Sequence, residues 1–148
     1  MDAFCFKLMA RSQANLVGVH DGLKELYSYM VERCPDGLFP CVVEGLRSKE
    51  RQAELRRAGV SWTNQSKHLT GEAIDVVLFS IGFDGIKVTY DPSDYGRFAT
   101  VCRLPRAFPG LVWGGNWKVR DYLHWELLRP IGQVPPEGGE GGGFSVIR

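Results

Sequence analysis

The stretch SKHLTGEAIDVVLF (residues 66–79) places a histidine and an aspartate seven positions apart. Its second half, AIDVVLF, is an apolar run typical of a buried strand, yet that run contains Asp75. Burying a carboxylate costs free energy unless the group is hydrogen-bonded, paired with a cation or bound to a metal. Taken alone, Asp75 is best explained as a buried aspartate that caps a turn or pairs with an arginine. Whether it does more depends on the residues that the rest of the chain can bring to it.

The overall composition is that of an ordinary globular domain. The chain has 148 residues, of which 44% are hydrophobic and 24% charged, and its formal net charge is +1. This length suits a single domain, and the balanced charge gives no indication of nucleic-acid binding. No segment approaches the roughly 20 apolar residues that span a bilayer, and the N-terminus does not resemble a signal peptide. We therefore expect a monomer that is made in the cytosol and has no stable membrane association.

Four cysteines are distributed without CxxC spacing, at positions 5, 34, 41 and 102. Free cysteine is a common small core residue in reducing compartments. We expect all four to be reduced, structural thiols.

Hydrophobic periodicity predicts an α+β fold. In residues 21–33 apolar side chains recur at helical spacing, with Asp21 as the expected N-cap and His20 in a structural role before it. Ser48 is expected to cap a second helix that runs to about Arg57. The other expected elements are strands at 41–43 and 73–79, an edge strand or hairpin arm at 84–92, a helix at 93–102 and a strand-like run at 122–128.

The chain divides into one folded domain and a tail. Residues 1–130 contain all the periodic segments and are expected to form a single domain. Residues 131–148 include the run PPEGGEGGG and are expected to be flexible.

Two histidines could bind a metal ion together with Asp75, and that ion would be the partner of the buried carboxylate. Two neutral imidazoles, from His68 and His124, and one carboxylate make a tridentate set that suits zinc. Such a set leaves a fourth position for water, which is typical of a catalytic rather than a structural site. Gly71 lets the chain turn so that His68 and Asp75 can converge. In the run around His124, strand alternation points His124 and Glu126 to one side and the intervening tryptophan to the other.

Asp121 and Arg47 are the candidate catalytic side chains. A zinc-bound water needs a base, and Asp121 is the leading candidate because it lies three residues before His124. Strict strand geometry would put positions 121 and 124 on opposite faces, so Asp121 must lie in the turn before the strand. Arg47 is expected where the chain passes from strand to helix, and its planar guanidinium can hold an oxyanion or a substrate carboxylate.

Other residues are weaker candidates for the site. Trp113 and Trp117 are equally well explained as core residues or as the wall of a substrate groove, and Trp62 is expected in a loop or groove. Glu72 and Glu126 are possible alternative bases, although Glu126 is better explained as a residue that supports the metal ligands.

Three motifs together resemble those of a family of zinc peptidases. They are SxHxxGxAxD at residues 66–75, WGGxW at 113–117 and DxxHxE at 121–126. The chain looks like the D-alanyl-D-alanine carboxypeptidase group, and most resembles its branch of L-alanyl-D-glutamate endopeptidases that serve as bacteriophage endolysins. The likeness also takes in SQANLVGVH (12–20) and GLRSKERQ (45–52), so it covers nearly the whole domain.

The resemblance implies a fold and a set of site residues. The implied fold is a small, mainly antiparallel sheet flanked by helices, related to the zinc-binding domain of hedgehog proteins. One Zn²⁺ ion is implied, with a general base beside it, an arginine that stabilises substrate or oxyanion, and residues that support the ligand loop. The corresponding residues are His68, Asp75 and His124 for the metal, Asp121 for the base, Arg47 for the arginine, and Ser66 and, less closely, Gln52 for support.

The resemblance also implies a function. The protein is expected to cleave the L-alanyl-D-glutamate bond in the stem peptide of bacterial peptidoglycan, by metal-activated water. As a bacteriophage endolysin it would stay in the host cytoplasm until a separate membrane-permeabilising protein gave it access to the cell wall, and it would then lyse the host and act as an antimicrobial. Two alternatives stay open: a D-alanyl-D-alanine carboxypeptidase or dipeptidase on the same scaffold, and a non-enzymatic, zinc-stabilised module that binds the cell wall.

Overall fold

The computed structural model describes residues 2–61, 66–102 and 110–128. Within these ranges the chain forms helices and an antiparallel sheet, which confirms the predicted α+β class. None of the helices in these ranges has the length and apolarity that crossing a membrane requires. Trp62 and the predicted flexible tail at 131–148 lie outside the described residues. The helices are α1 (Ala3–Asn15), α2 (Asp21–Arg33), α3 (Lys49–Arg57) and α4 (Pro92–Cys102), with short 3₁₀ helices η1 (Lys67–Thr70) and η2 (Gly114–Asn116); the strands are β1 (Leu38–Glu44), β2 (Ala73–Gly82), β3 (Gly85–Thr89), β4 (Leu111–Trp113) and β5 (His124–Leu127).

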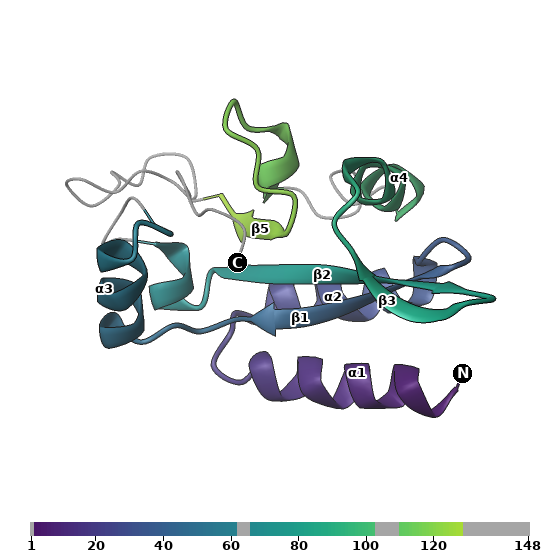
Figure 1. Cartoon of the computed structure of the whole chain (residues 1–148). Helices are drawn as coiled ribbons and strands as arrows, with labels where there is room; N and C mark the ends of the chain where they lie inside the picture. The colour runs from purple at the N-terminus through teal and green to yellow at the C-terminus, as the bar shows by residue number, and fades with distance from the viewer. Residues whose placement is uncertain (1, 62–65, 103–109, 129–148) are drawn as a thin grey trace.

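Strand β2 is the centre of the sheet, whose order is β1-β2-β5-β4 (Figure 1). Strand β1 pairs along one edge of β2. On the other edge, β5 pairs with residues 73–75 of β2, and β3 pairs with residues 78–82 to form a hairpin. All these pairings are antiparallel, as predicted.

One face of the sheet carries the main hydrophobic core. Leu26 and Met30 of α2 and Phe98 of α4 pack there against Ile74 of β2 and Trp125 of β5. Each of these side chains is at most 1% exposed, and burying a side chain of this kind stabilises the fold by about 1.5–3 kcal/mol. Two helices therefore close this face of the sheet.

Helix α1 packs on the opposite face. Its Phe4 ring meets the ring of Phe79 on β2, with centroids 5.7 Å apart. Because side chains alternate along a strand, Asp75 and Phe79 point to the same face. The face that α1 covers at one end is therefore the face that presents Asp75 at the other.

Two thiols lie in the contact between α1 and β1. Cys5 and Cys41 are buried free thiols, as predicted. Burial raises the pKa of each thiol above its ordinary value, which keeps it protonated. Both cysteines therefore act as core residues.

The helix starts follow local capping chemistry. Ser48 caps α3, as predicted, by accepting a hydrogen bond from the N–H of Arg51 at 3.0 Å. The prediction that Asp21 caps α2 is wrong, because the N-cap is His20, whose Nδ1 accepts from the N–H of Gly22 at 3.0 Å. An imidazole nitrogen can replace the usual oxygen acceptor, and Asp21 then lies in the first turn, where the helix dipole favours a negative charge. The structural role expected of His20 is confirmed.

A β-bulge at the end of β1 shapes the approach to Asp75. Val42 lies opposite Val76, but Glu44, and not Val43, lies opposite Asp75. The extra residue bends the strand and changes which side chain is presented to the partner. The bulge thereby brings the carboxylate of Glu44 to the face that carries Asp75.

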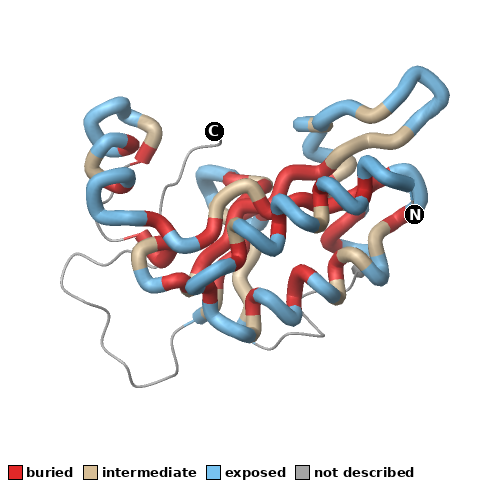
Figure 2. The backbone as a smooth tube through the Cα atoms, turned by 90° about the horizontal axis from the view of Figure 1, so that it is seen from below, coloured by how far each residue is buried: buried red, intermediate tan, exposed pale blue. Residues whose placement is uncertain are grey.

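Burial falls along β2 from one end to the other. Residues 73–78 are buried, residues 79–81 are half-buried and Gly82 is exposed. The β2–β3 hairpin extends into solvent at the end of the molecule opposite α3 (Figures 1 and 2). The polar residues around Asp75 therefore lie at the well-packed end of the strand.

Candidate metal centre

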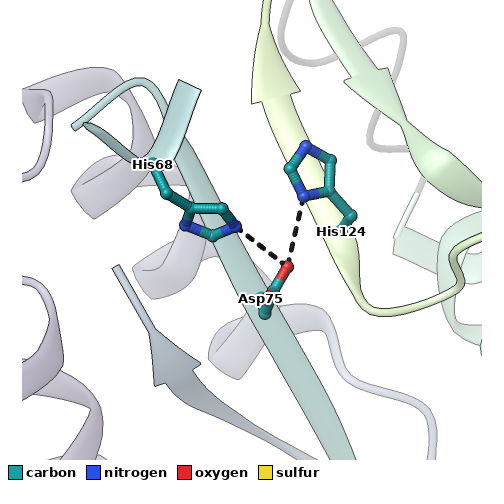
Figure 3. A group of neighbouring side chains, drawn as sticks. All are labelled: His68, Asp75 and His124. Carbon is teal, nitrogen blue, oxygen red and sulfur yellow. Dashed lines mark hydrogen bonds and ion pairs between the residues drawn. The ribbon is translucent and has the colours of Figure 1, made fainter. Parts of the chain in front are cut away.

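His68, Asp75 and His124 converge on one point (Figure 3). His68 Nε2 and His124 Nδ1 each lie 3.2 Å from Oδ1 of Asp75. Ligand atoms held about 2.1 Å from a tetrahedral zinc ion are about 3.4 Å apart, so these distances are close to those of a metal site. All three residues are buried, and one ligand atom from each lies within 4.8 Å of the others. The fold thus brings the predicted ligands together in a cluster that is able to hold a metal ion.

The sheet and η1 position these three side chains. Asp75 on β2 and His124 on β5 are direct partners in the antiparallel register, so they share a face. His68 approaches from η1, whose N-cap Ser66 accepts a hydrogen bond from the N–H of His68 at 3.2 Å. Gly71 ends η1 with φ of 73°, a conformation that favours glycine, and a Cβ at this position would lie 2.5 Å from the carbonyl oxygen of Gly18. The ligand loop therefore depends on Ser66 at its start and on a glycine at its end.

Hydrogen bonds on the far side of each imidazole fix its orientation. His68 Nδ1–H donates to the carbonyl oxygen of Gly45 at 2.9 Å, which leaves the Nε2 lone pair facing Asp75. His124 Nε2 lies 3.1 Å from Oε1 of Glu126, so its N–H donates there and the Nδ1 lone pair faces Asp75. Two lone pairs and a carboxylate oxygen that face one another need a cation or a proton between them. The donor set therefore fits a metal ion.

The electrostatics of the metal-free cluster agree with this geometry. Burial by itself raises the pKa of Asp75, but attraction to His68 and hydrogen bonds to His124 and His68 outweigh it and hold that pKa well below its ordinary value. Burial by itself lowers the pKa of His124, but hydrogen bonds and attraction to Asp75 and Glu126 raise it to about 9. In the absence of metal, a proton thus serves as the cation that the cluster requires.

Among the residues that the structure describes in and around the cluster, the ionisable groups carry a net negative charge. When both histidines are neutral, the carboxylates outnumber the cations by two, which one divalent ion would balance. The buried cations are Arg47 and Lys67, the buried carboxylates are Asp75, Asp121 and Glu126, and the partly buried carboxylate is Glu44.

Arg47 lies at the corner between β1 and α3, as predicted, with its guanidinium fixed on two sides. Nε donates to Oε1 of Glu44 at 2.7 Å, and Nη1 donates to Oε1 of Gln52 at 2.6 Å. Gln52 in turn donates to Oγ of Ser61 at 2.9 Å. The remaining nitrogen, Nη2, is 3.9 Å from Oδ2 of Asp75 and has no hydrogen bond to the residues that the structure describes. Arg47 therefore presents a buried donor beside the ligand cluster, and Gln52 supports it.

Asp121 lies in the turn before β5, as predicted. Its carbonyl oxygen accepts a hydrogen bond from the N–H of His124 at 3.3 Å, and its own N–H donates to the carbonyl oxygen of Gly114 at 3.0 Å. Its side chain is buried. Because Asp121 lies in the turn and not in the strand, strand alternation does not force it to the face opposite His124. Both residues lie at the start of β5.

The tryptophans of the WGGNW motif have different surroundings. The ring of Trp117 lies 5.1 Å from that of His124, centroid to centroid, which places Trp117 beside the cluster. The ring of Trp113 instead stacks on Trp125 at 5.4 Å, and its Nε1–H donates to the carbonyl oxygen of Tyr122 at 2.9 Å. Because Trp125 faces the hydrophobic core, the structure assigns Trp113 to packing and leaves Trp117 as the candidate groove residue.

Sequence reasoning does not identify Lys67, which the structure buries beside the cluster. Its Nζ lies 2.7 Å from Oε2 of Glu126 and also donates to the carbonyl oxygen of Leu127. Lysine is rarely buried, so a lysine within a motif is first assigned to the surface. Its position next to His68 was the only signal in the sequence.

Comparisons with known proteins agree with the geometry. The sequence profile of a family described as phage L-alanyl-D-glutamate peptidase matches residues 4–129. The crystal structure of the Serratia marcescens L-Ala D-Glu endopeptidase ChiX matches with a TM-score of 0.66 and 38% sequence identity, over 80% of this chain and 86% of that chain. No curated protein sequence gives a significant match.

A more distant solved structure is that of a mutant of the vancomycin resistance D,D-pentapeptidase VanY in complex with Zn(II). It matches with a TM-score of 0.40 and 18% identity, over 74% of this chain and 70% of that chain. This likeness is too low to bear on the site. The family profile, in contrast, spans all three motifs, two of which carry the candidate ligands and base, and it confirms the resemblance seen in the sequence. The chain belongs to the family of phage L-alanyl-D-glutamate peptidases.

Proposed function

We propose that the protein is a zinc-dependent endopeptidase that cleaves the L-alanyl-D-glutamate bond of the peptidoglycan stem peptide. The observation that carries this proposal is the convergence of His68, Asp75 and His124 in a chain that belongs to a peptidase family. The family description and the activity named for the similar protein ChiX support the choice of scissile bond, and the ligand cluster supports metal-dependent hydrolysis.

Zinc is the metal that suits the donor set. Two imidazole nitrogens and one carboxylate oxygen, with a fourth position open, are typical ligands of catalytic zinc. The negative charge of the described residues in and around the cluster also favours a divalent ion. When bound there, zinc would polarise the scissile carbonyl and lower the pKa of water to about 7.

The remaining chemistry falls to side chains of this chain. Asp121 would accept a proton from the attacking water as the new C–O bond forms, and would deliver it to the amine nitrogen as the C–N bond breaks. Arg47 would use its available Nη2 donor to hold the developing oxyanion or a carboxylate of the substrate. Trp117 would form the wall of the site beside His124.

The family description also supports a role as a phage endolysin. In this role the protein collects in the host cytoplasm and reaches the cell wall after a separate protein permeabilises the membrane, which leads to host lysis. Expression in a susceptible bacterium tests this role: lysis is expected only when a membrane-permeabilising protein is co-expressed. Lysis or secretion without that helper would contradict it.

Mass spectrometry of purified muropeptides tests the reaction itself. Incubation with zinc-loaded protein should release fragments cut between L-alanine and D-glutamate, whereas metal-stripped protein and zinc-loaded Asp121→Asn should release almost none. Release of a single alanine would replace the proposal with the carboxypeptidase alternative. Tight binding of muropeptides without cleavage, by protein with one zinc ion per chain, would support the non-enzymatic binding module.

A further inference from the structure

A chain of buried contacts runs from Lys67 to His124. The ammonium group of Lys67 lies 2.7 Å from Oε2 of Glu126, and Oε1 of the same carboxylate lies 3.1 Å from Nε2 of His124. The side chains of Lys67, Glu126 and His124 are at most 4% exposed. One carboxylate thus joins a buried cation to a candidate metal ligand.

The same lysine connects the two segments that carry the histidines. Lys67 precedes His68 on η1, and its ammonium also donates to the carbonyl oxygen of Leu127 on β5. Backbone hydrogen bonds also join the two segments. The N–H of Leu127 donates to the carbonyl oxygen of Glu72, and the N–H of Glu72 donates to the carbonyl oxygen of Lys67, each at 3.0 Å. Lys67 is therefore fixed to both segments before any metal binds.

We propose that Lys67 is a positioning residue of the metal centre, which holds Glu126 so that His124 presents Nδ1, and not Nε2, to the ion. Without Lys67, the carboxylate of Glu126 would be free to rotate or would have to leave the buried site, because an uncompensated buried charge is costly. His124 would then lose the acceptor that fixes its Nε2–H. The proposal rests on the zinc site of the proposed function and adds to it the residue that sets one ligand's orientation.

The competing explanation is that Lys67 and Glu126 only stabilise the fold. In that case replacement of the pair would change the free energy of unfolding but would leave the metal affinity of the folded protein unchanged. Metal affinity and the protonation of the ligand rings therefore distinguish the two explanations.

The first test compares zinc affinity, measured by competition with a chelator, in the wild type, in Lys67→Met and in the matched control Lys87→Met. Lys87 is also paired with a carboxylate, but its side chain is 64% exposed and far along the hairpin. Lys67→Met should weaken zinc binding about 10–100-fold, as is typical for groups that support metal ligands, and Lys87→Met should leave it unchanged. A folded Lys67→Met protein with wild-type zinc affinity would overturn the proposal.

A double-mutant cycle tests whether Lys67 acts through Glu126. Glu126→Gln removes the charge but keeps an oxygen that can accept from His124. In this background, Lys67→Met should change zinc affinity less than about twofold, because the partner through which it acts is already altered. A further loss of tenfold or more in the double variant would show that Lys67 acts independently of Glu126 and would overturn the proposal. The double variant leaves no charge buried alone, so it keeps the test usable if Lys67→Met by itself fails to fold.

Nitrogen-15 NMR of the histidine rings in zinc-loaded wild type needs no variant at all. We expect His124 to carry its proton on Nε2 and bind zinc through Nδ1, and His68 to show the reverse arrangement. Zinc bound through Nε2 of His124 would overturn the proposal. A wild type that bound no zinc, or that bound it equally well after His68→Ala and His124→Ala, would instead contradict the proposed function.

Discussion

The two ends of β2 place the same kind of ion pair in opposite environments. At the metal end, Lys67 and Glu126 are 2.7 Å apart, with side chains at most 4% exposed. At the hairpin end, Lys87 and Asp84 are 2.5 Å apart, with side chains 64% and 72% exposed. Water screens the exposed charges and solvates either one when its partner is lost, whereas a buried charge has no such substitute. A short distance therefore does not measure the importance of an ion pair, and burial does.

The largest difference between the two ends should appear in catalysis. Asp121→Asn removes the proposed base and should lower kcat about 10²–10⁴-fold while zinc stays bound. Asp84→Asn, the same substitution at the hairpin, should leave kcat unchanged. Initial rates on a synthetic stem peptide, with zinc content measured in parallel, check both variants. Full activity of zinc-loaded Asp121→Asn would show that another group serves as the base.

Stability should separate the two lysines next. Lys67→Met leaves Glu126 with only His124, which it shares with Asp75, and should lower the free energy of unfolding by about 3–5 kcal/mol because one partner of a buried ion pair is lost. Lys87→Met exposes nothing that water cannot solvate and should leave the stability unchanged. Urea denaturation of the metal-free proteins gives both values. Equal losses in the two variants would refute the distinction that we draw from burial.

Stabilisation of the folded domain by zinc should depend on the residues at the metal end and not on those of the hairpin. At a free zinc concentration about 100 times its Kd, binding stabilises the folded state by about 2.7 kcal/mol, which corresponds to a rise in Tm of roughly 5–10 °C for a domain of this size. Calorimetry should show this rise in the wild type and in Lys87→Met, and no rise in His124→Ala. A rise that survives His124→Ala would place the bound zinc elsewhere.

A pH dependence of the metal-free protein is also expected. Because the pKa of His124 is raised from 6.5 to about 9, the stability that its protonated form contributes is complete below pH 6.5 and is lost as the pH rises through 9. The depressed pKa of Asp75 acts in the opposite direction, but only below pH 3.8. The urea midpoint, measured in the presence of a chelator, should therefore fall between pH 6.5 and 9. His124→Gln should not show this fall, and an unchanged midpoint in the wild type would mean that His124 titrates normally.

The clustering of His68, Asp75 and His124 could be predicted from sequence because each stands in a short motif. Asp75 interrupts an apolar strand, and the alternation of β5 separates His124 from the core side chain of Trp125. The turn around Asp121 followed from the conflict between its position and strand geometry. Local periodicity and the cost of burying a charge singled out these residues, but the full ligand set also depended on the resemblance to the motifs of a known family, because periodicity alone does not bring His68 to Asp75.

Other features depend on contacts that no local pattern contains. Helix α1 is not predicted because its apolar residues do not form one stripe: Leu8 is buried while Phe6 is 60% exposed. Strand β4 has only three residues, too few for periodicity to be recognised. The buried Lys67 and the carbonyl oxygen of Gly45 that orients His68 both depend on chain segments far apart in sequence. These contacts around the candidate metal ligands form only when the sheet is assembled, so no local sequence pattern predicts them.

The close backbone contacts behind the ligand loop define what can be exchanged in an engineered chimaera. A Cβ at Gly45 would lie 2.1 Å from the carbonyl oxygen of Asn15, and a Cβ at Gly71 would lie 2.5 Å from that of Gly18. The connection between α1 and α2 thus packs directly against the segments around Gly45 and Gly71, which position His68. A designer who transplants the loop that carries His68 and Asp75 into a related peptidase must move residues 15–20, 44–48 and 66–75 together, whereas the β2–β3 hairpin tip can be replaced on its own.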